Sequence, residues 1–273
     1  MPERKRLDRS NIAIVIPALN EALRIRGVVE GALAQCDLVI LIDDGSDDDT
    51  VGCIADLPVT VVRHAQRMGK GASLRDGFRA ALERGALAVL TMDGDGQHSA
   101  DDIPRLLEAG NCYPGYVVIG ARLRKRSQQP TYRRLANEFG DWGIGWGCGF
   151  RIADSQSGQR LYPAEVAALD VPGEDFVFEA QILMSASHQL GTRCVSIPIE
   201  SRYHGPDAVE QFRRSHFRPL RDLWRITSHT VGEILRRGDV LSEYRRTRST
   251  PPVIHDPSGE FVRAVPARAQ RAG

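Results

Sequence analysis

Two carboxylates two residues apart offer the clearest chemistry in this sequence. Asp93 and Asp95 lie in LTMDGDGQHS, residues 90–99, directly after an apolar run that is typical of a strand. Where a strand meets a loop, both side chains could turn toward one divalent cation, with Gln97 or His98 as a further ligand. Such oxygen ligands suit Mg²⁺ or Mn²⁺, which proteins often hold together with substrate phosphates. Asp-Gly pairs also form ordinary turns, so this stretch alone leaves both interpretations open.

A second acidic pair follows another apolar run. Asp43 and Asp44 lie in LIDDGSDDDT, residues 41–50. D-D-G-S also makes a good turn, and Ser46 with Asp49 three residues later could form a capping box for a following helix. The pair alone is therefore weaker evidence for a site. The pair gains weight from its position, because it ends a predicted strand, as Asp93 and Asp95 do.

The elements that position these acids alternate along the first 122 residues. Apolar runs predict strands in NIAIVIPAL, DLVILIDDGS, VTVVRHA, LAVLTMDGD and YVVIGAR, and the segments between them carry helical patterns, the first capped by Asn20 and the last opened by Ser99. Buried strands separated by helices indicate an α/β protein with a mostly parallel sheet, whose ligands bind at the carboxyl ends of the strands. The residues that we expect at that edge are Pro17, Asp43, Asp44, Asp93, Asp95 and Arg122.

The second half of the chain predicts fewer clear elements. PTYRRLANEFGDWGIGWGCGF could be a helix that breaks up at its glycines, FVFEAQILMSASHQLG predicts an amphipathic helix, and TRCVSIPIESRY predicts a strand. Residues 216–237 form an arginine-rich amphipathic pattern, which suits either a helix on an anionic membrane surface or a helix packed on the core. From about residue 239 the chain is rich in Arg, Pro and Ser, which predicts a flexible basic tail.

Length and composition allow one large domain or two small ones, and the predicted elements indicate one main domain at residues 11–238, between an extension at residues 1–10 and the tail at residues 239–273. The chain has 273 residues, 42% of them hydrophobic, enough for a substantial core, and its net charge of +1 provides no overall attraction to nucleic acid. The five cysteines are scattered and the N-terminus has no apolar signal region, so we expect a cytoplasmic protein with reduced thiols. No apolar run approaches the roughly 20 residues of a membrane-spanning helix, so membrane contact would be peripheral, at the inner face.

Several motifs together resemble those of glycosyltransferase family 2. IVIPALNE, LIDDGSDDDT, RMGKGASLRDGF, TMDGDGQHSADDIPRLL, VIGAR and DSQSGQRLYP appear in the order and spacing typical of that family. The resemblance covers roughly residues 11–225 and is greatest to the dolichol- or polyprenol-phosphate sugar (mannose or glucose) synthase branch. It implies a catalytic domain of GT-A fold, in which a Rossmann-like, mostly parallel sheet is flanked by helices, and a nucleotide-sugar donor. Leu19, where relatives often have an aromatic residue, and Gln159, where SGFR is common, depart from the pattern.

The resemblance also implies roles around the donor. Asp93 and Asp95 would bind Mg²⁺ or Mn²⁺ with Gln97 as the extra ligand, and the metal would neutralise charge that grows on the leaving nucleotide. Asp44 would contact the base or ribose, and Lys70 would lie near the phosphates. The same sequence also fits a solvated Lys70 in a flexible loop. The other implied donor contacts are Pro17, Asn20 and Glu21 in the nucleotide pocket and Arg202 at the donor phosphates.

Two arginines match positions that hold the acceptor phosphate in polyprenol-phosphate enzymes. These are Arg122, at the end of the fifth predicted strand, and Arg133, with Asn137 one helical turn later. A guanidinium suits this task because its fork binds phosphate oxygens in pairs. RLRKR and YRR could equally be surface charge. His204 and His216 are candidate neighbours of the metal or structural histidines.

The acceptor decides whether the enzyme needs a base. The resemblance implies inversion at the anomeric carbon by direct displacement. A phosphate monoester has a second pKa of about 6 and is mostly dianionic at pH 7, so it can attack without a protein base. A hydroxyl acceptor would require a general base, for which Asp175 and Glu179 are the candidates, and either could instead be a charge at a helix start.

Three functions remain open at the level of sequence. The first is metal-dependent transfer of a sugar from a GDP- or UDP-sugar to a polyprenyl phosphate. The second is transfer to a saccharide or small-molecule hydroxyl by the same fold. The third is a non-catalytic nucleotide-sugar-binding protein, which the retained metal acids and acceptor arginine disfavour. GDP-mannose, UDP-glucose and UDP-N-acetylhexosamine are all compatible donors, and the sequence indicates no oligomeric state.

Overall fold

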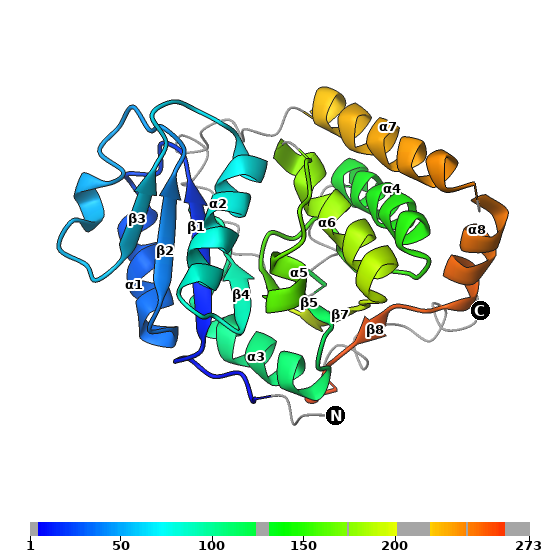
Figure 1. The fold of residues 1–273 in the computed structure, drawn as a ribbon, viewed down its shortest axis with the longest axis horizontal. Coiled ribbons are helices and arrows are strands. Elements are labelled where there is room, and N and C mark those ends of the chain that lie inside the picture. Colours follow the sequence, from blue (N-terminus) through cyan, green and yellow to red (C-terminus); the bar gives the residue numbers. More distant parts are fainter. Residues whose placement is uncertain (1–4, 124–130, 174, 201–218, 239, 260–273) are drawn as a thin grey trace.

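The computed structural model describes residues 5–123, 131–173, 175–200, 219–238 and 240–259. Its described part contains one sheet of eight strands in the order β3-β2-β1-β4-β6-β5-β7-β8, with helices on both faces (Figure 1). The strands are β1 (Ile12–Ala18), β2 (Val39–Asp43), β3 (Thr60–Arg63), β4 (Ala88–Thr91), β5 (Val117–Ala121), β6 (Arg160–Pro163), β7 (Cys194–Pro198) and β8 (Val253–Ile254). The helices are α1 (Ile25–Gln35), α2 (Lys70–Glu83), α3 (Ile103–Cys112), α4 (Thr131–Cys148), α5 (Ala164–Ala167), α6 (Asp175–Leu190), α7 (Pro219–Arg237) and α8 (Val240–Ser249), with short 3₁₀ helices η1 (Gly52–Ile54) and η2 (Ala100–Asp102).

The expected mostly parallel sheet is confirmed, and its exception is β6. This strand runs antiparallel to both of its neighbours, β4 and β5, whereas the other strand pairs are parallel. The sequence does not predict β6, because RLYP is short and begins with a charged residue. Since β6 runs opposite to its neighbours, the segment that leads into it, residues 154–159, lies at the edge where β4 and β5 end.

Side chains of β1 alternate between two apolar layers. Val15 packs in the layer that contains Phe178 of α6 and residues of α2 and α4. Ile14 packs in the opposite layer, with Leu106 of α3 and residues of α1. Successive side chains of a strand point to opposite faces, so helices bury the sheet on both sides. Polar groups at the carboxyl ends of the strands are therefore the ones that a ligand can reach.

The expected helix boundaries need three corrections. α1 begins at Ile25 rather than directly after Asn20, and only η1 lies between Ser46 and β3. α4 is a continuous helix of 18 residues and does not break at its glycines. These glycines allow close packing instead, because a Cβ on Gly147 would lie 2.4 Å from Sδ of Met184. Ser99 does cap the helical segment that follows it, since its Oγ accepts a hydrogen bond at 3.2 Å from an N–H of η2.

The segment after residue 239 is more ordered than its composition predicts. α8 packs on α4, where Nε1 of Trp146 donates to the carbonyl oxygen of Val240 at 3.1 Å and the Trp146 ring contacts the Tyr244 ring. β8 then pairs with β7. Composition misses this order because it comes from contacts with distant residues. Of the predicted flexible tail, residues 240–249 thus form a helix and residues 253–254 a strand, and residues 260–273 lie outside the described part.

α7 covers most of the predicted 216–237 helix and packs against α4 and α6 (Figure 1). Thr230 and Ile234 are buried, whereas Val231 and Leu235 are exposed. Of the two alternatives for this segment, the structure therefore has the helix on the core. Among the described helices, none has the length and apolar composition needed to cross a membrane.

Candidate active site

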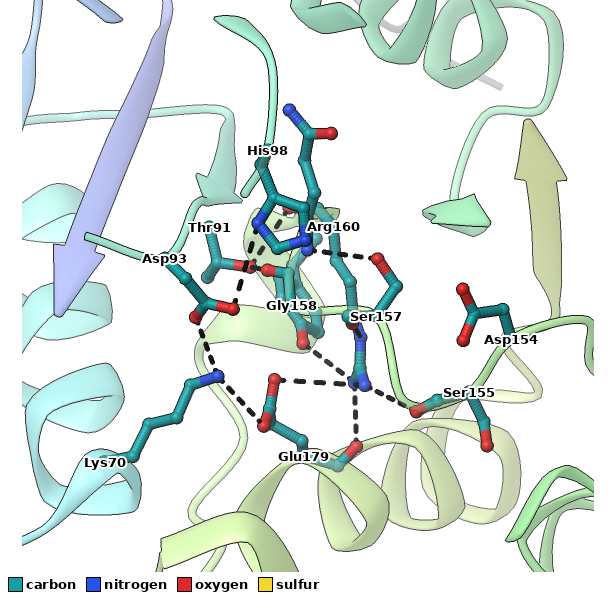
Figure 2. A network of polar contacts seen from close by, with 12 residues as sticks. Lys70, Thr91, Asp93, His98, Asp154, Ser155, Ser157, Gly158, Arg160 and Glu179 are labelled. Carbon is teal, nitrogen blue, oxygen red and sulfur yellow. Dashed lines mark hydrogen bonds and ion pairs between the residues drawn. The ribbon is translucent and has the colours of Figure 1, made fainter. Parts of the chain in front are cut away.

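Asp93, which follows β4, belongs to a polar network at the carboxyl edge of the sheet (Figure 2). Its Oδ1 lies 2.8 Å from Nζ of Lys70, the first residue of α2. The same ammonium lies 3.3 Å from Oε2 of Glu179 on α6. Asp93 thus shares one cation with a carboxylate from a distant part of the chain.

The charges of this network shift the pKa values of its groups. Burial opposes ionisation of Asp93, but Lys70 and His98 outweigh it and hold the pKa of Asp93 at about 2. Burial and the charge of Asp93 raise the pKa of Asp95. Burial acts to lower the pKa of Lys70, yet the carboxylates of Asp93 and Glu179 raise it above its ordinary value. The edge therefore holds the ionised pair of Lys70 and Asp93 beside Asp95, whose ionisation is opposed. An added cation would relieve the repulsion between the two carboxylates.

Asp44 anchors the turn that places Lys70. Its carboxylate accepts hydrogen bonds from the N–H groups of Met68 at 2.7 Å and Gly69 at 2.8 Å, and it lies 2.8 Å from Nδ1 of His64. Gly69 has a φ of 93°, a left-handed conformation that glycine adopts without steric cost. Asp44, which directly follows β2, therefore fixes the start of α2. Its contact with a base or ribose stays a prediction.

The loops after β1 and β2 are tied together at the same edge. The N–H of Asn20 donates to Oγ of Ser46 at 2.9 Å, and the N–H of Glu21 donates to Oγ1 of Thr50 at 2.9 Å. Asn20 itself has a φ of 57°. Pro17 lies near the end of β1, next to these loops. The four predicted donor residues Pro17, Asn20, Glu21 and Asp44 thus lie on neighbouring segments, and their roles in nucleotide binding stay predictions.

Arg122, directly after β5, is held by Asp154. Nε of Arg122 donates to Oδ2 of Asp154 at 2.8 Å, and a terminal nitrogen donates to Oδ1 at 2.7 Å. The pair is mostly buried. Arg122 is also among the charges that lower the pKa of Asp93. The structure thus brings the predicted acceptor arginine and the predicted metal acid into one electrostatic site, from strands that β6 separates.

Asp141 of α4 holds the segment that contains Asp154. Its carboxylate accepts from the N–H of Asp154 at 3.1 Å and from the N–H of Ser155 at 2.6 Å. Burial and the charge of Asp154 raise the pKa of Asp141 to about 6. Asp154 has a φ of 55°, so its backbone adopts the left-handed conformation that Asp and Asn tolerate better than other side chains. Sequence reasoning does not single out either acid, although DSQSGQRLYP contains one of them.

Arg160, at the start of β6, is the buried support of this edge (Figure 2). Its guanidinium donates to the carbonyl oxygens of Ser155 and Ser157, each at 2.7 Å, and of Glu179 at 2.9 Å. A cation needs such partners when it is fully buried. The backbone of Gly158 packs on Asp93, because a Cβ at position 158 would lie 2.3 Å from Oδ2 of Asp93. The DSQSGQR motif is therefore a structural frame for the site.

Some of the remaining predicted residues lie outside the part of the chain that the structure describes. Arg133 belongs to α4, but its side chain is not described, and Asn137 of the same helix is partly buried. Arg202, His204 and His216 lie outside the described residues. Asp175 begins α6 close to the start of α2, since a Cβ on Gly69 would lie 2.2 Å from its Oδ1.

The donor set suits a cation that is shared with a substrate. Within the described ranges, no three His, Cys, Asp or Glu side chains are arranged to hold a metal ion. Asp93 and Asp95 nevertheless offer two carboxylates in one turn, and the N–H of Gln97 donates to Oδ1 of Asp95 at 3.0 Å. Nδ1 of His98 is buried, has no hydrogen bond to a described residue and lies 3.8 Å from Oδ2 of Asp93. Mg²⁺ commonly takes one or two carboxylates together with substrate phosphates, so these residues fit it.

Comparison with known proteins supports the motif analysis. Residues 13–163, more than half of the chain, match the model of glycosyl transferase family 2. The chain is 30% identical over 203 residues to undecaprenyl-phosphate mannosyltransferase of Micrococcus luteus, which covers 69% of this chain and 82% of that protein. It is 29% identical over 208 residues to polyprenol monophosphomannose synthase of Mycolicibacterium smegmatis, with 68% and 75% covered.

A solved structure supports the fold. Glucosyl-3-phosphoglycerate synthase from Mycobacterium tuberculosis, in complex with Mn²⁺, UDP and glucosyl-3-phosphoglycerate, superposes with a TM-score of 0.60 at 21% identity, covering 83% of this chain and 79% of that one. At this identity the likeness shows the shared GT-A fold. The family match shows that the chain belongs to glycosyltransferase family 2, in which it is similar to the polyprenol-phosphate sugar transferases.

Proposed function

We propose that this family 2 glycosyltransferase transfers a sugar from a GDP- or UDP-sugar to a polyprenyl phosphate, with inversion at the anomeric carbon. The observation that carries the proposal is that one segment at this edge of the sheet contacts both Arg122 and Asp93. Oδ2 of Asp154 accepts from Nε of Arg122 at 2.8 Å, and a Cβ at Gly158 would lie 2.3 Å from Oδ2 of Asp93. Such an edge offers a carboxylate for a cation with a diphosphate and a guanidinium for a second phosphate. The relatives named for undecaprenyl phosphate and polyprenol support this acceptor class.

On the donor side, Asp93, Asp95 and Gln97 would hold Mg²⁺ or Mn²⁺. When bound, such a cation neutralises negative charge on the leaving diphosphate. Lys70 would add a positive charge at the same place, because its ammonium already lies 2.8 Å from Asp93. The loops after β1 and β2, with Pro17, Asn20, Glu21 and Asp44, would bind the nucleoside, and Arg202 would reach the donor phosphates.

On the acceptor side, Arg122 would bind the phosphate of the lipid. Asp154 fixes the plane of its guanidinium from one side, so the group is oriented before the acceptor arrives. Arg133 and Asn137, on α4, would bind the same phosphate. A phosphate dianion needs no protein base. Glu179, one of the two candidate bases for a hydroxyl acceptor, lies 3.3 Å from the ammonium of Lys70, and this ion pair makes it a poorer base.

The test is a turnover screen with purified full-length protein and Mg²⁺ or Mn²⁺. GDP- and UDP-sugars are offered with and without a short polyprenyl phosphate, and released nucleotide and lipid-linked sugar are measured. We expect nucleotide release that depends on the lipid phosphate, with sugar on that phosphate. Metal-dependent nucleotide release that ignores the lipid but responds to a saccharide or small-molecule alcohol would overturn the acceptor assignment.

A further inference from the structure

Lys70 lies between two carboxylates that come from different elements. Its Nζ is 2.8 Å from Oδ1 of Asp93, after β4, and 3.3 Å from Oε2 of Glu179, on α6 (Figure 2). The side chain of Lys70 is only 20% exposed, and that of Glu179 only 10%. In such surroundings charges interact more strongly than at an open surface. The position of the ammonium therefore strongly affects the charge that Asp93 presents to any ligand.

Lys70 and a divalent cation would compete for Asp93. Both are attracted to the same carboxylate, and the ammonium already contacts one of its two oxygens. Asp95 follows two residues later in the same turn, so a divalent cation would gain a second carboxylate ligand in addition to Asp93. Coulomb's law makes a cation site weaker when a positive charge lies within a few ångströms of its ligands.

Glu179 is placed to receive the ammonium when it leaves Asp93. The Glu179 backbone is fixed, since its carbonyl oxygen accepts from Arg160 at 2.9 Å. The start of α2 is fixed as well, by the two N–H bonds to Asp44. Only the side chain of Lys70 has to move, and four rotatable bonds allow this. An ammonium that stays on Glu179 remains beside the place where a diphosphate would bind.

We propose that Lys70 is the resident counter-ion of Asp93 in the donor-free enzyme, that a divalent cation replaces it there, and that Glu179 retains its ammonium for the donor diphosphate. This inference rests on the proposed function, because it requires a cation at Asp93 and Asp95. Glu179 is then a positioning residue that acts through Lys70. A further consequence is that nucleotide and cation strengthen each other's binding, because the diphosphate draws Lys70 away from Asp93.

This exchange of the Lys70 ammonium for a divalent cation at Asp93 predicts that two substitutions change the affinity for Mn²⁺ in opposite directions. Lys70→Gln removes the competitor, so the affinity for Mn²⁺ alone rises roughly ten-fold or more, whereas the affinity for UDP or GDP at saturating Mn²⁺ falls by a similar factor. Glu179→Gln removes the carboxylate that competes with Asp93 for the ammonium, so Lys70 stays closer to Asp93 and the affinity for Mn²⁺ alone falls. In the double variant Lys70→Gln/Glu179→Gln, the second substitution has little further effect on the affinity for Mn²⁺, because Glu179 acts through Lys70, which is absent.

The experiment measures Mn²⁺ binding to the full chain by electron paramagnetic resonance and nucleoside diphosphate binding by calorimetry. Arg79→Gln is the matched control, because it removes one positive charge from an exposed position of the same helix. Thermal unfolding checks that each variant is folded, and the Glu179→Gln arm keeps the test valid if Lys70→Gln does not fold. A rise in Mn²⁺ affinity with a fall in nucleotide affinity supports the exchange.

Three outcomes would overturn it. Equal Mn²⁺ affinities of the wild type and Lys70→Gln exclude competition but leave the proposed function intact. Equal changes in Lys70→Gln and Arg79→Gln reduce the effect to overall charge. Absence of Mn²⁺ binding by the wild type and by Lys70→Gln contradicts both the exchange and the proposed metal.

Discussion

Asp154 binds Arg122 at three points. Its Oδ2 accepts the backbone N–H of Arg122 at 2.7 Å and Nε at 2.8 Å, and its Oδ1 accepts a terminal guanidinium nitrogen at 2.7 Å. Two parallel charge-assisted bonds fix the plane of a guanidinium as well as its position. The orientation of the proposed acceptor cation thus depends on a residue 32 positions later in the chain.

Asp154→Asn should weaken acceptor binding selectively. Asn tolerates the left-handed backbone of position 154, so the turn is kept while the charge of the pair is lost. We expect the KM for a short polyprenyl phosphate to rise roughly ten-fold, with nucleotide affinity unchanged. Steady-state kinetics with varied acceptor and calorimetry with UDP or GDP measure the two quantities. An unchanged acceptor KM would contradict the role of the pair.

Asp95→Ala should abolish turnover with little effect on folding. Burial and the charge of Asp93 already oppose ionisation of Asp95, so its removal relieves repulsion in the folded protein. Turnover with Mn²⁺ and the thermal unfolding midpoint are the two readouts. Glu83→Ala, at an exposed position of α2, is a control that should leave both unchanged. Wild-type activity in Asp95→Ala would argue against the metal assignment.

Gly158→Ala should impair the site through Asp93. An added Cβ would lie 2.3 Å from Oδ2 of Asp93, too close for any contact, so the carboxylate has to turn away from its present position. We expect turnover to fall at least ten-fold, on the order of 1.4 kcal/mol in activation free energy. Gly143→Ala is the matched control, because the nearest atom to its new Cβ is 4.0 Å away. Similar activities of the two variants would disprove the contact's importance.

Asp141 should make stability depend on pH. Burial and the charge of Asp154 raise its pKa to about 6 in the folded state, so the folded protein binds this proton more tightly than the unfolded chain. Its contribution to stability is then complete below about pH 3.8 and is lost as the pH rises through about 6. The non-titrating variant Asp141→Asn lacks this dependence.

Chemical denaturation of both proteins between pH 4 and pH 7 measures this effect. The free energy of unfolding of the wild type minus that of Asp141→Asn should decrease with rising pH. The displacement of the pKa from 3.8 to about 6 corresponds to roughly 3 kcal/mol at most. A constant difference over this range would mean that Asp141 titrates at its ordinary pKa.

The sequence by itself determined the α/β class, the parallel strands of the first half and the acids at their ends. These features are local, because a buried strand in a parallel sheet is a continuous apolar run and a strand end is marked by Asp and Gly beside it. Asp93, Asp95, Asp44 and Arg122 could therefore be assigned to one edge before the structure was known. The family motifs added the GT-A fold, which the comparisons bear out.

Only the tertiary structure decided how these residues are held. β6 enters the sheet between β4 and β5 in the opposite direction, and four residues with a leading arginine give no sequence signal for this. Lys70, Asp93 and Glu179 meet from three separate elements, and Trp146 with Tyr244 orders a segment whose composition predicts flexibility. Such contacts join residues far apart in sequence, and their energies depend on burial and distance, which exist only once the chain is folded.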